Sequence, residues 1–279
     1  MGPANNVIFQ TGSQQRSQGN FRAAANLIHN GVIGKVKRVE VGLPTGHKNS
    51  PGDKEGDIPA HLDYNFWCGP SERKPYVEKR CHWNWRWHLS YGGGQLMDWI
   101  GHHNDIAHWG LGLDKSGPTE VKAIGFEYPS DRRVWNAAWK YEVLSKYAEG
   151  YEISISNRYE RGTKWIGEDG WVFVARGKFR ASNPEWVKKG FKAGEKQVYN
   201  SPEHHRNFLD GIKSRKDCIC TAETGHRSIT PGHLGLLSES LGGRVIKWDP
   251  KKEVVIGDVE ADKTLKAINF RSFRSPWAG

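Results

Sequence analysis

The sequence predicts a mixed α/β fold whose main element is a mostly antiparallel β-sheet. A strand–helix–strand order opens the chain over residues 6–43, and four strand-like runs separated by glycine and aspartate turns fill the middle third. Two amphipathic helical segments follow between residues 203 and 241. The spacing of apolar residues, near 2 in strands and near 3.6 in helices, distinguishes these segments. At 279 residues the chain is long enough for one large domain or two small ones.

The first 43 residues are expected to form a strand, a helix and a second strand. Residues 6–12 are a largely apolar run that ends at a glycine, which is typical of a short buried strand. Residues 21–30 predict a helix with Gly31 just past its end as the cap. The residues expected on its inner face are Phe21, Ala24, Ala25 and Ile28. Residues 36–43 alternate as a half-buried strand does.

A long excursion and a tryptophan-rich segment come next. Residues 44–79 are rich in Pro, Gly, Asp and Lys, and long loops of this kind are usually functional or mobile. In residues 82–88 (HWNWRWH) the tryptophans alternate, so they share one face if the segment is extended. A hydrophobic strand face explains that alternation without any ligand. Because the segment abuts the motif described next, we favour a substrate wall containing Trp85, Arg86 and His88.

The most informative stretch is residues 91–112, where three glycines precede an amphipathic run. Glycine has no Cβ, so the backbone can turn sharply or approach a ligand there before a helix begins. Asp98 and His102 stand four residues apart and Asp105 three further on, so they project from one side of the helix. A carboxylate beside an imidazole is an acid/base pair near neutral pH, although such pairs also occur merely as solvated contacts.

Further polar residues on the same helix strengthen the functional interpretation. His103 and His108 lie among apolar and aromatic residues, and buried polar groups are costly unless they are paired. This clustering makes Asp98 and His102 our candidate catalytic residues and His103 a candidate substrate contact.

The rest of the chain is expected to contain the sheet and two helices. The strand-like runs are residues 120–126, 138–144, 151–157 and 170–175, with hairpin signals at Gly162, Gly167, Asp169 and Gly170. Residues 203–214 predict an amphipathic helix with Phe208, Leu209 and Ile212 inward, and residues 224–241 predict a helical region broken near Pro231. There, His226, Arg227 and His233 have either a functional role or a core or capping role. Residues 248–277 read as a turn-rich tail with a short strand at 254–256.

The net charge and the tryptophan content of the chain indicate which kinds of partner it can bind. The net charge of +10 raises the question of an anionic partner, but acidic residues interleave with the basic ones and no nucleic-acid module is present. We therefore expect no nucleic-acid partner, and an anionic small substrate or a merely basic surface fits better. The 13 tryptophans offer flat faces with one donor that suit sugar rings, although each can equally fill a core.

Cysteine usage and hydropathy indicate the compartment. Cys68, Cys81, Cys218 and Cys220 lack the spacing of a zinc or redox site, so free thiols in a reducing compartment are expected. The chain shows no signal peptide and no apolar run approaching a membrane span. We expect a cytoplasmic protein without a membrane partner.

Four motifs together carry a resemblance to a known family. They are residues 10–17 (QTGSQQRS), the Gly31-x-x-Gly34 turn before a strand, residues 92–105 with Asp98, His102 and Asp105, and residues 225–228 (GHRS). In combination they resemble the glucose-fructose oxidoreductase and inositol dehydrogenase family (Gfo/Idh/MocA), especially its bacterial sugar-acting branch, over nearly the whole chain.

The resemblance implies a fold and a set of site residues. Family members join an N-terminal Rossmann domain to a C-terminal domain with an open, mostly antiparallel sheet and helices packed on one face. By resemblance, Asp98 and His102 supply the catalytic groups and Asp105 binds a sugar hydroxyl. In the matching motifs, Arg16, His226 and Arg227 become candidate substrate contacts.

The sequence departs from the family at its beginning. In the family, the strand similar to residues 7–12 closes the Rossmann sheet, and the residues before it hold the glycine-rich cofactor loop and a Glu-Lys-Pro tripeptide. Here Glu78-Lys79 is followed by Arg80, and no G-x-G-x-x-G follows a strand. We expect residues 1–34 to be a remnant of the cofactor domain, residues 35–279 to form the sheet domain, and no dinucleotide to bind this chain alone.

Three functions remain open. The first is a carbohydrate-active enzyme in which Asp98 and His102 catalyse hydrolysis, elimination or epimerisation of a sugar or glycoside, with a divalent metal on Asp98, His102 and His226 as an option. The second is the substrate domain of an NAD(P)-dependent sugar oxidoreductase whose cofactor domain lies on another chain or was removed. The third is a non-catalytic sugar-binding or oligomer-forming protein. We favour the first because Met1 is compatible with a natural start, and we expect a homo-oligomer through the open sheet in all three.

Overall fold

The computed structural model describes residues 7–50 and 52–269, and these residues fold around one open β-sheet. The strands are β1 (Val36–Gly42), β2 (Glu120–Glu127), β3 (Lys140–Lys146), β4 (Glu152–Ser156), β5 (Gly162–Gly167), β6 (Trp171–Ala175), β7 (Lys178–Ala181), β8 (Ile246–Asp249) and β9 (Val254–Val255). Their spatial order is β7-β6-β5-β1-β4-β3-β2-β8-β9. Every neighbouring pair is antiparallel except β1 and β4, which run parallel. The predicted mixed α/β class with an open, mostly antiparallel sheet is confirmed.

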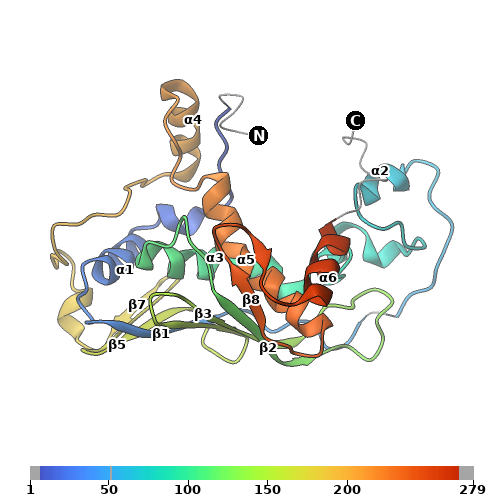
Figure 1. Ribbon diagram of the computed structural model, residues 1–279. Coiled ribbons are helices and arrows are strands. Elements are labelled where there is room, and N and C mark those ends of the chain that lie inside the picture. The colour runs from blue at the N-terminus through green and yellow to red at the C-terminus, as the bar shows by residue number, and fades with distance from the viewer. Residues whose placement is uncertain (1–6, 51, 270–279) are drawn as a thin grey trace.

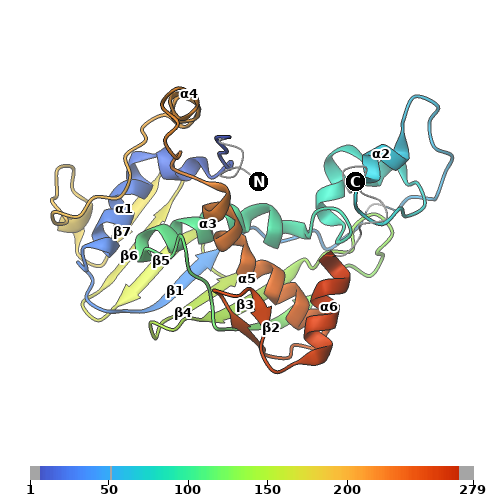
Figure 2. The ribbon, with the colours of Figure 1, turned by 45° about the horizontal axis from the view of Figure 1, so that its top comes forward.

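The long helices lie together on one face of this sheet (Figure 1). They are α1 (Gly19–His29), α3 (Gly94–Leu111), α5 (Ala222–Ser240) and α6 (Val259–Asn269). The short helix α2 (Tyr64–Cys68) and the helix α4 (His204–Ser214) project from opposite ends of the helical layer in both views (Figures 1 and 2). The 3-10 helices are η2 (Gln14–Ser17), η3 (Glu78–Arg80), η4 (His82–Trp87) and η5 (Pro184–Val187).

The main core fills the space between the sheet and the helices. Alternate strand residues such as Val39 and Val41 of β1 and Trp165 of β5 point inward and are fully buried. They belong to one hydrophobic cluster with Ile100 and Ile106 of α3. Because burial stabilises by about 25 cal/mol per Å² of apolar surface, this layer is the principal source of stability. It also fixes α3 against the sheet.

The glycines before α3 are needed for the path of the backbone. Gly93 and Gly94 both adopt φ of 77°, a left-handed conformation that favours glycine. A Cβ at Gly92 would lie 2.5 Å from Cα of Arg86, so η4 and this loop approach each other backbone to backbone. The predicted loop feeding a helix is confirmed, and it brings Arg86 close to the start of α3.

Several other predicted elements are confirmed with small shifts of their ends. Helix α1 buries Phe21, Ala24, Ala25 and Ile28, and Gly31 adopts the expected positive φ. Strand β1 and the four middle runs, now β2, β3, β4 and β6, are present, as is the short strand β9. All four cysteines are free thiols. No helix in the described ranges is long and apolar enough to cross a membrane.

One predicted strand is wrong, and the extended conformation considered for residues 82–88 is not formed. Residues 7–12 do not pair with a neighbouring strand in the part of the chain described, and Val7 and Phe9 are more than half exposed; residue 6 lies outside the described residues. Residues 82–87 form the 3-10 helix η4, in which neighbours turn by roughly 120°. The alternating tryptophans therefore do not share a face: Trp83 is 66% exposed, whereas Trp87 is 5% exposed.

The C-terminal third also differs from expectation. Leu209 and Ile212 are largely exposed because α4 extends away from the body of the protein (Figure 1). Helix α5 continues through Pro231, because its packing against α3 and the sheet overrides the low helix propensity of proline. The predicted tail contains α6, whose first turn is capped by Asp258 Oδ1 accepting from the Ala261 N–H at 3.0 Å. Residues 270–277 lie outside the described residues.

Three strands were missed. The glycines that suggested hairpins, Gly162 and Gly167, stand at the two ends of β5 itself, and the turn follows them. Strands β7 and β8 have only four residues each, too few for a clear alternation.

Gly92→Ala is expected to lower the free energy of unfolding by about 1–3 kcal/mol, because the added methyl group must push the Arg86 backbone away. Gly56→Ala is the matched control, since nothing lies within 4 Å of its Cβ position, and should change stability by less than about 0.5 kcal/mol. Urea unfolding of both variants measures the difference. Equal stabilities would show that the close approach is not required.

Candidate functional site

A cavity of about 490 Å³ lies where the N-terminal segment, α3 and α5 meet. Its polar lining residues are Thr11, Ser13, Asp98, His102, His226 and Ser228, and its apolar ones include Phe9, Met97 and Ile229. Three of the candidates from the sequence, Asp98, His102 and His226, therefore share one cavity. We refer to it as the α3 pocket.

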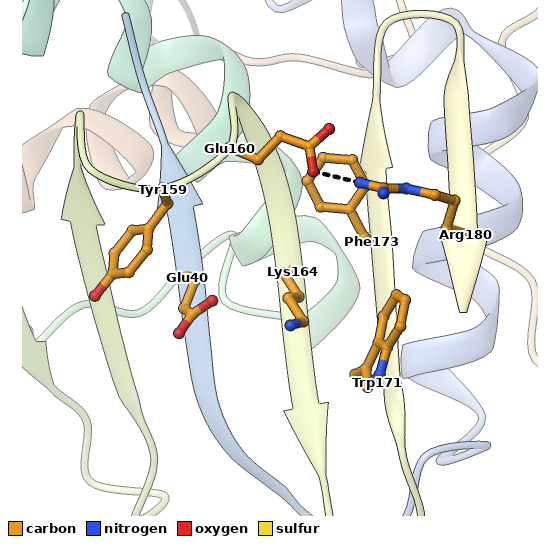
Figure 3. A pocket seen from close by; sticks show the side chains of 7 residues that line it. All are labelled: Glu40, Tyr159, Glu160, Lys164, Trp171, Phe173 and Arg180. Carbon is orange, nitrogen blue, oxygen red and sulfur yellow. Dashed lines mark hydrogen bonds and ion pairs between the residues drawn. The ribbon is translucent and has the colours of Figure 1, made fainter. Parts of the chain in front are cut away.

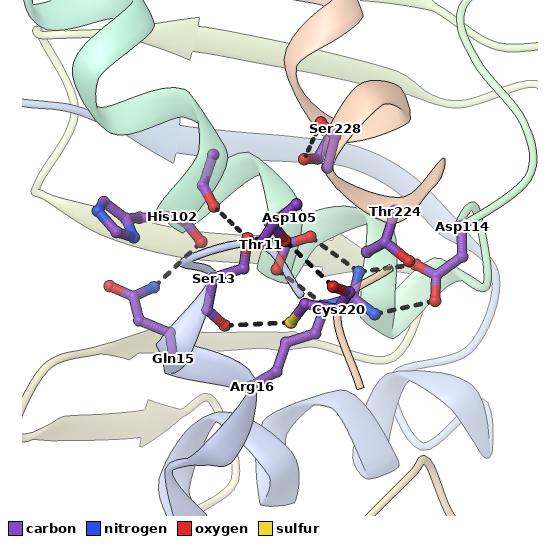
Figure 4. A network of polar contacts seen from close by, with 12 residues as sticks. Thr11, Ser13, Gln15, Arg16, His102, Asp105, Asp114, Cys220, Thr224 and Ser228 are labelled. Atoms are coloured by element: carbon purple, nitrogen blue, oxygen red, sulfur yellow. Dashed lines mark hydrogen bonds and ion pairs between the residues drawn. The ribbon is translucent and has the colours of Figure 1, made fainter. Parts of the chain in front are cut away.

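Hydrogen bonds to mid-helix carbonyl groups hold α3 in place beside this pocket (Figure 4). Ser13 Oγ donates to the Gly101 carbonyl at 3.1 Å, and Gln15 Nε2 donates to the His102 carbonyl at 3.1 Å. From the sheet side, Thr163 Oγ1 donates to the His103 carbonyl at 2.7 Å. These bonds restrain the backbone that carries the His102 ring.

A buried ion pair anchors the N-terminal segment to the same helix. Arg16 donates to both oxygens of Asp105, at 2.8 and 2.9 Å, and also to both oxygens of Asp114 (Figure 4). Arg16 and Asp105 are 1% and 0% exposed. Burial raises the pKa of Asp105 to about 6, and the Arg16 charge opposes that rise, so the carboxylate is mostly ionised at pH 7.

The ion pair involves two residues that were predicted to contact substrate, Arg16 and Asp105. Both oxygens of Asp105 accept from Arg16, and neither residue lines the α3 pocket. In this arrangement Arg16 and Asp105 join the N-terminal segment to α3, and a direct contact of either with a sugar stays a prediction.

His102 has the chemistry of a neutral base. Burial, and then the charge of Arg176, lowers its pKa below the ordinary value, so the ring is uncharged at neutral pH. Its Nδ1 atom is buried and has no hydrogen-bond partner among the described residues. An unpaired buried polar atom costs about 1–3 kcal/mol unless a ligand or water satisfies it. The ring can therefore accept a hydrogen bond or a proton.

Asp98 reaches the same pocket with a different partner. Its side chain is 31% exposed, and Oδ1 lies 3.5 Å from Nε of Arg86. Burial raises the pKa of Asp98, and Arg86 opposes that rise. No hydrogen bond or ion pair joins Asp98 to His102 within the described residues, so the expected carboxylate–imidazole contact is not formed. The two groups instead face one cavity separately.

The other predicted contacts on α3 and η4 take up packing positions. His103 is buried behind the pocket, with its Nδ1 3.3 Å from Gln15 Nε2 and its ring stacked on Trp99, and burial lowers its pKa to about 3. His88 is buried against Asn136, and burial lowers its pKa to about 4. Neither lines the α3 pocket.

The tryptophan segment contributes through Arg86. Its guanidinium lies over the rings of Trp83 and Trp85, at 4.4 and 4.8 Å, while it pairs with Asp98. Trp85 thus supports Arg86 and is not among the lining residues of the pocket. Arg86 is thus held over two indoles while it pairs with Asp98, and a substrate contact of Trp85 or Arg86 stays a prediction.

The two candidate residues on α5, His226 and Arg227, have different surroundings. His226 lines the pocket and its Nε2 is 2.7 Å from Glu253 Oε1. Arg227 pairs with Glu223 and Glu253 outside the pocket.

Sequence reasoning missed the residues that close the pocket from the N-terminal side. Thr11 and Ser13 belong to the QTGSQQRS motif, from which only Arg16 was chosen. A Cβ at Gly225 would lie 2.5 Å from Cγ2 of Thr11, so the glycine of the GHRS motif allows the N-terminal segment to pack closely against α5. The two motifs meet in space, which their separation in the sequence concealed.

The described residues contain neither a metal-ligand cluster nor a Rossmann-type phosphate loop. They contain no group of three or more His, Cys, Asp or Glu side chains suited to a metal ion. They also contain no strand followed by a glycine-rich loop and a helix; the 3-10 helix η2 precedes α1. The backbone arrangement that holds the diphosphate of NAD(P) in Rossmann domains is thus not among the described elements, and that the chain binds no dinucleotide alone stays a prediction.

Comparison with known proteins identifies related folds. The Gfo/Idh/MocA family model described as "Oxidoreductase family, C-terminal alpha/beta domain" matches residues 19–278. The aldose-aldose oxidoreductase from Caulobacter crescentus, complexed with glycerol, is similar with a TM-score of 0.56 and 16% identity, over 88% of this chain and 65% of that one. The WlbA dehydrogenase from Bordetella pertussis, in complex with NADH and UDP-GlcNAcA, is similar with a TM-score of 0.60 and 16% identity. The match covers 89% of this chain and 66% of the WlbA chain.

These likenesses show the fold alone, because the identities are low. The chain spans about two thirds of the length of these structures. No curated protein matches the sequence.

Arg16→Met is expected to lower the free energy of unfolding by about 3–5 kcal/mol at pH 8, because it leaves the buried Asp105 charge unpaired. This loss of stability should be smaller at pH 4. Without Arg16 the folded-state pKa of Asp105 rises further, so at low pH the carboxyl is neutral and needs no partner. The destabilisation appears as the pH rises and the buried carboxyl ionises. Urea unfolding at both pH values measures it. Arg206→Met, which breaks the exposed pair with Asp210, is the control and should cost less than about 0.5 kcal/mol. A loss below 1 kcal/mol for Arg16→Met at pH 8 would contradict the anchoring role.

Proposed function

Because the chain belongs to the Gfo/Idh/MocA oxidoreductase family, we propose that it is the substrate-binding part of an NAD(P)-dependent sugar oxidoreductase. The α3 pocket is the proposed substrate site, and Asp98 and His102 are the proposed catalytic residues. The observation that carries the proposal is that His102, whose ring is neutral and whose buried Nδ1 has no partner among the described residues, lines the same cavity as Asp98.

The hydrolase or lyase activity that the sequence favoured is not supported. The family match and the similar structures are oxidoreductases. The pocket also argues against glycoside hydrolysis, which ordinarily needs two carboxyl groups flanking the scissile bond. Asp98 is the one carboxylate among the residues that line it. The NAD(P)-dependent alternative is therefore the better-supported hypothesis.

The side chains of the pocket suit the proton chemistry of alcohol oxidation. When a sugar hydroxyl becomes a carbonyl, its oxygen loses a proton while the carbon loses a hydride to a dinucleotide, which this chain's described residues do not hold. His102 is neutral near pH 7 and can accept that proton. Asp98 can accept a hydrogen bond from a neighbouring hydroxyl and so orient the ring. Ser13 and Thr11 on the opposite wall offer further hydroxyl groups.

Asp98→Asn and His102→Gln are expected to weaken binding of neutral sugars such as D-glucose or myo-inositol to this chain, as measured by saturation-transfer NMR. In the dinucleotide-dependent reaction of the complete protein, His102→Gln should lower kcat by about 100-fold or more, because the proton acceptor is lost. His205→Gln, an exposed histidine on α4, is the control. Release of product from glycosides by this chain without NAD(P) would contradict the proposal, and so would an unchanged kcat in His102→Gln.

We also propose a homo-oligomer through the open face of the sheet. A hollow of about 300 Å³ on this face is lined by Trp171, Phe173 and charged residues of both signs (Figure 3). Glu160 pairs there with Lys178 and Arg180. A two-fold interface brings a patch against its own copy, so mixed charges around aromatic groups favour self-association.

Trp171→Glu is expected to shift the protein from oligomer to monomer, measured by size-exclusion chromatography with light scattering, because it places a negative charge in the hollow proposed as the interface. Phe66→Glu, at an exposed aromatic residue on α2, should leave the mass unchanged. A monomeric wild-type protein, or a Trp171→Glu variant of unchanged mass, would contradict the proposed interface.

A further inference from the structure

Two arginines lie on the indole of Trp99, which contacts the pocket residue His102 without lining the α3 pocket itself. The guanidinium carbons of Arg161 and Arg176 are 5.3 and 4.9 Å from the ring centroid of Trp99. The Trp99 ring in turn contacts His102, with centroids 5.6 Å apart. The arginines are thus grouped around one aromatic residue next to the proposed base.

The register of the sheet makes this grouping unfavourable by itself. Strands β5 and β6 pair with Thr163 opposite Val174. Continuing that register by two residues places Arg161 opposite Arg176. Like charges directly opposite each other across two strands are destabilising. Both side chains are exposed and partly screened by solvent, and an anion bound between them would relieve the remaining repulsion.

The described chain does not supply an opposing charge. Arg161 and Arg176 make no ion pair with any acidic residue that the structure describes. The nearest acid in sequence, Glu160, is engaged by Lys178 and Arg180 on the open face, as Figure 3 shows for Arg180. Asp98 pairs with Arg86. Two guanidinium groups remain without a counter-charge.

One of the two arginines is held in place by a buried residue. Gln15 is fully buried, and its Oε1 accepts from Arg176 Nε at 3.0 Å. The Nε2 of the same amide donates to the His102 carbonyl. Arg176 is exposed, but this buried amide links its guanidinium to the backbone of His102 and so restrains it near that residue.

We propose that the substrate carries an anionic group, a carboxylate or a phosphate, which Arg161 and Arg176 bind while a hydroxyl of the same molecule faces His102 in the α3 pocket. This inference rests on the proposed function and specifies its substrate class. Arginine is suited to the role because its planar fork pairs with carboxylate or phosphate oxygens in a bidentate manner. The bound anion also relieves the repulsion between the two arginines.

The test compares sugars that differ in charge. D-Glucuronate, D-glucose 6-phosphate and neutral D-glucose are titrated calorimetrically into the full chain. We expect at least one charged sugar to bind about 10-fold or more tightly than glucose, and the two charged probes distinguish a carboxylate from a phosphate. Arg161→Gln and Arg176→Gln should each remove the preference, and high salt should weaken it. Arg132→Gln is the matched control, since Arg132 also stacks on an aromatic ring, Tyr128, at 4.4 Å.

A second readout does not require a sugar of the right shape. Because the Arg176 charge contributes to the lowered pKa of His102, saturating phosphate or acetate should raise that pKa in an NMR titration, as should Arg176→Gln. Glucose binding without any charge preference, together with a His102 pKa indifferent to anions, would overturn the inference and leave the proposed function standing. Failure of all three sugars to bind would count against the proposed function as well.

Discussion

The arrangement of the site depends on the buried contact between Arg16 and Asp105. A buried charge is tolerated only when it is paired and hydrogen-bonded, and this carboxylate accepts two bonds from one guanidinium. The contact ties the segment before α1 to the middle of α3. Beside Arg16, Ser13 and Gln15 donate to the carbonyl groups of Gly101 and His102. The same segment supplies Thr11 and Ser13 to the lining of the α3 pocket.

A helix clamped in this way can keep an unsatisfied group at a fixed place. The His102 ring lies between a restrained backbone and the Trp99 indole, with Nδ1 buried and unpartnered among the described residues. Burial and a nearby cation keep the ring neutral, so it is a proton acceptor at neutral pH. On the open face of the sheet, by contrast, the carboxylate of Glu160 is paired with Lys178 and Arg180, so it is less suited to accept a proton.

Local signals in the sequence predicted the elements that carry this site, but not its contacts. Three glycines followed by a 3.6-residue periodicity identified α3, and spacing placed Asp98 and His102 on it correctly. Spacing along a helix does not reveal which residues from other segments pack against it. The same spacing grouped Asp105 with Asp98 and His102, yet Asp105 pairs with Arg16 in the core. The tryptophans of η4 alternate as in a strand, and nothing local excluded a 3-10 helix. Helix α4 has an amphipathic pattern, but its apolar residues meet solvent because it extends away from the body.

Asp98 and His102 are proposed to contact one sugar molecule in the α3 pocket, and a crystal structure of this chain with a bound sugar would show that contact. We expect ring density beside α3, with one hydroxyl within about 3.2 Å of His102 Nδ1 and a neighbouring hydroxyl on the Asp98 carboxylate. Sugar bound only on the open face of the sheet, or His102 Nδ1 facing protein atoms in an otherwise occupied pocket, would contradict it.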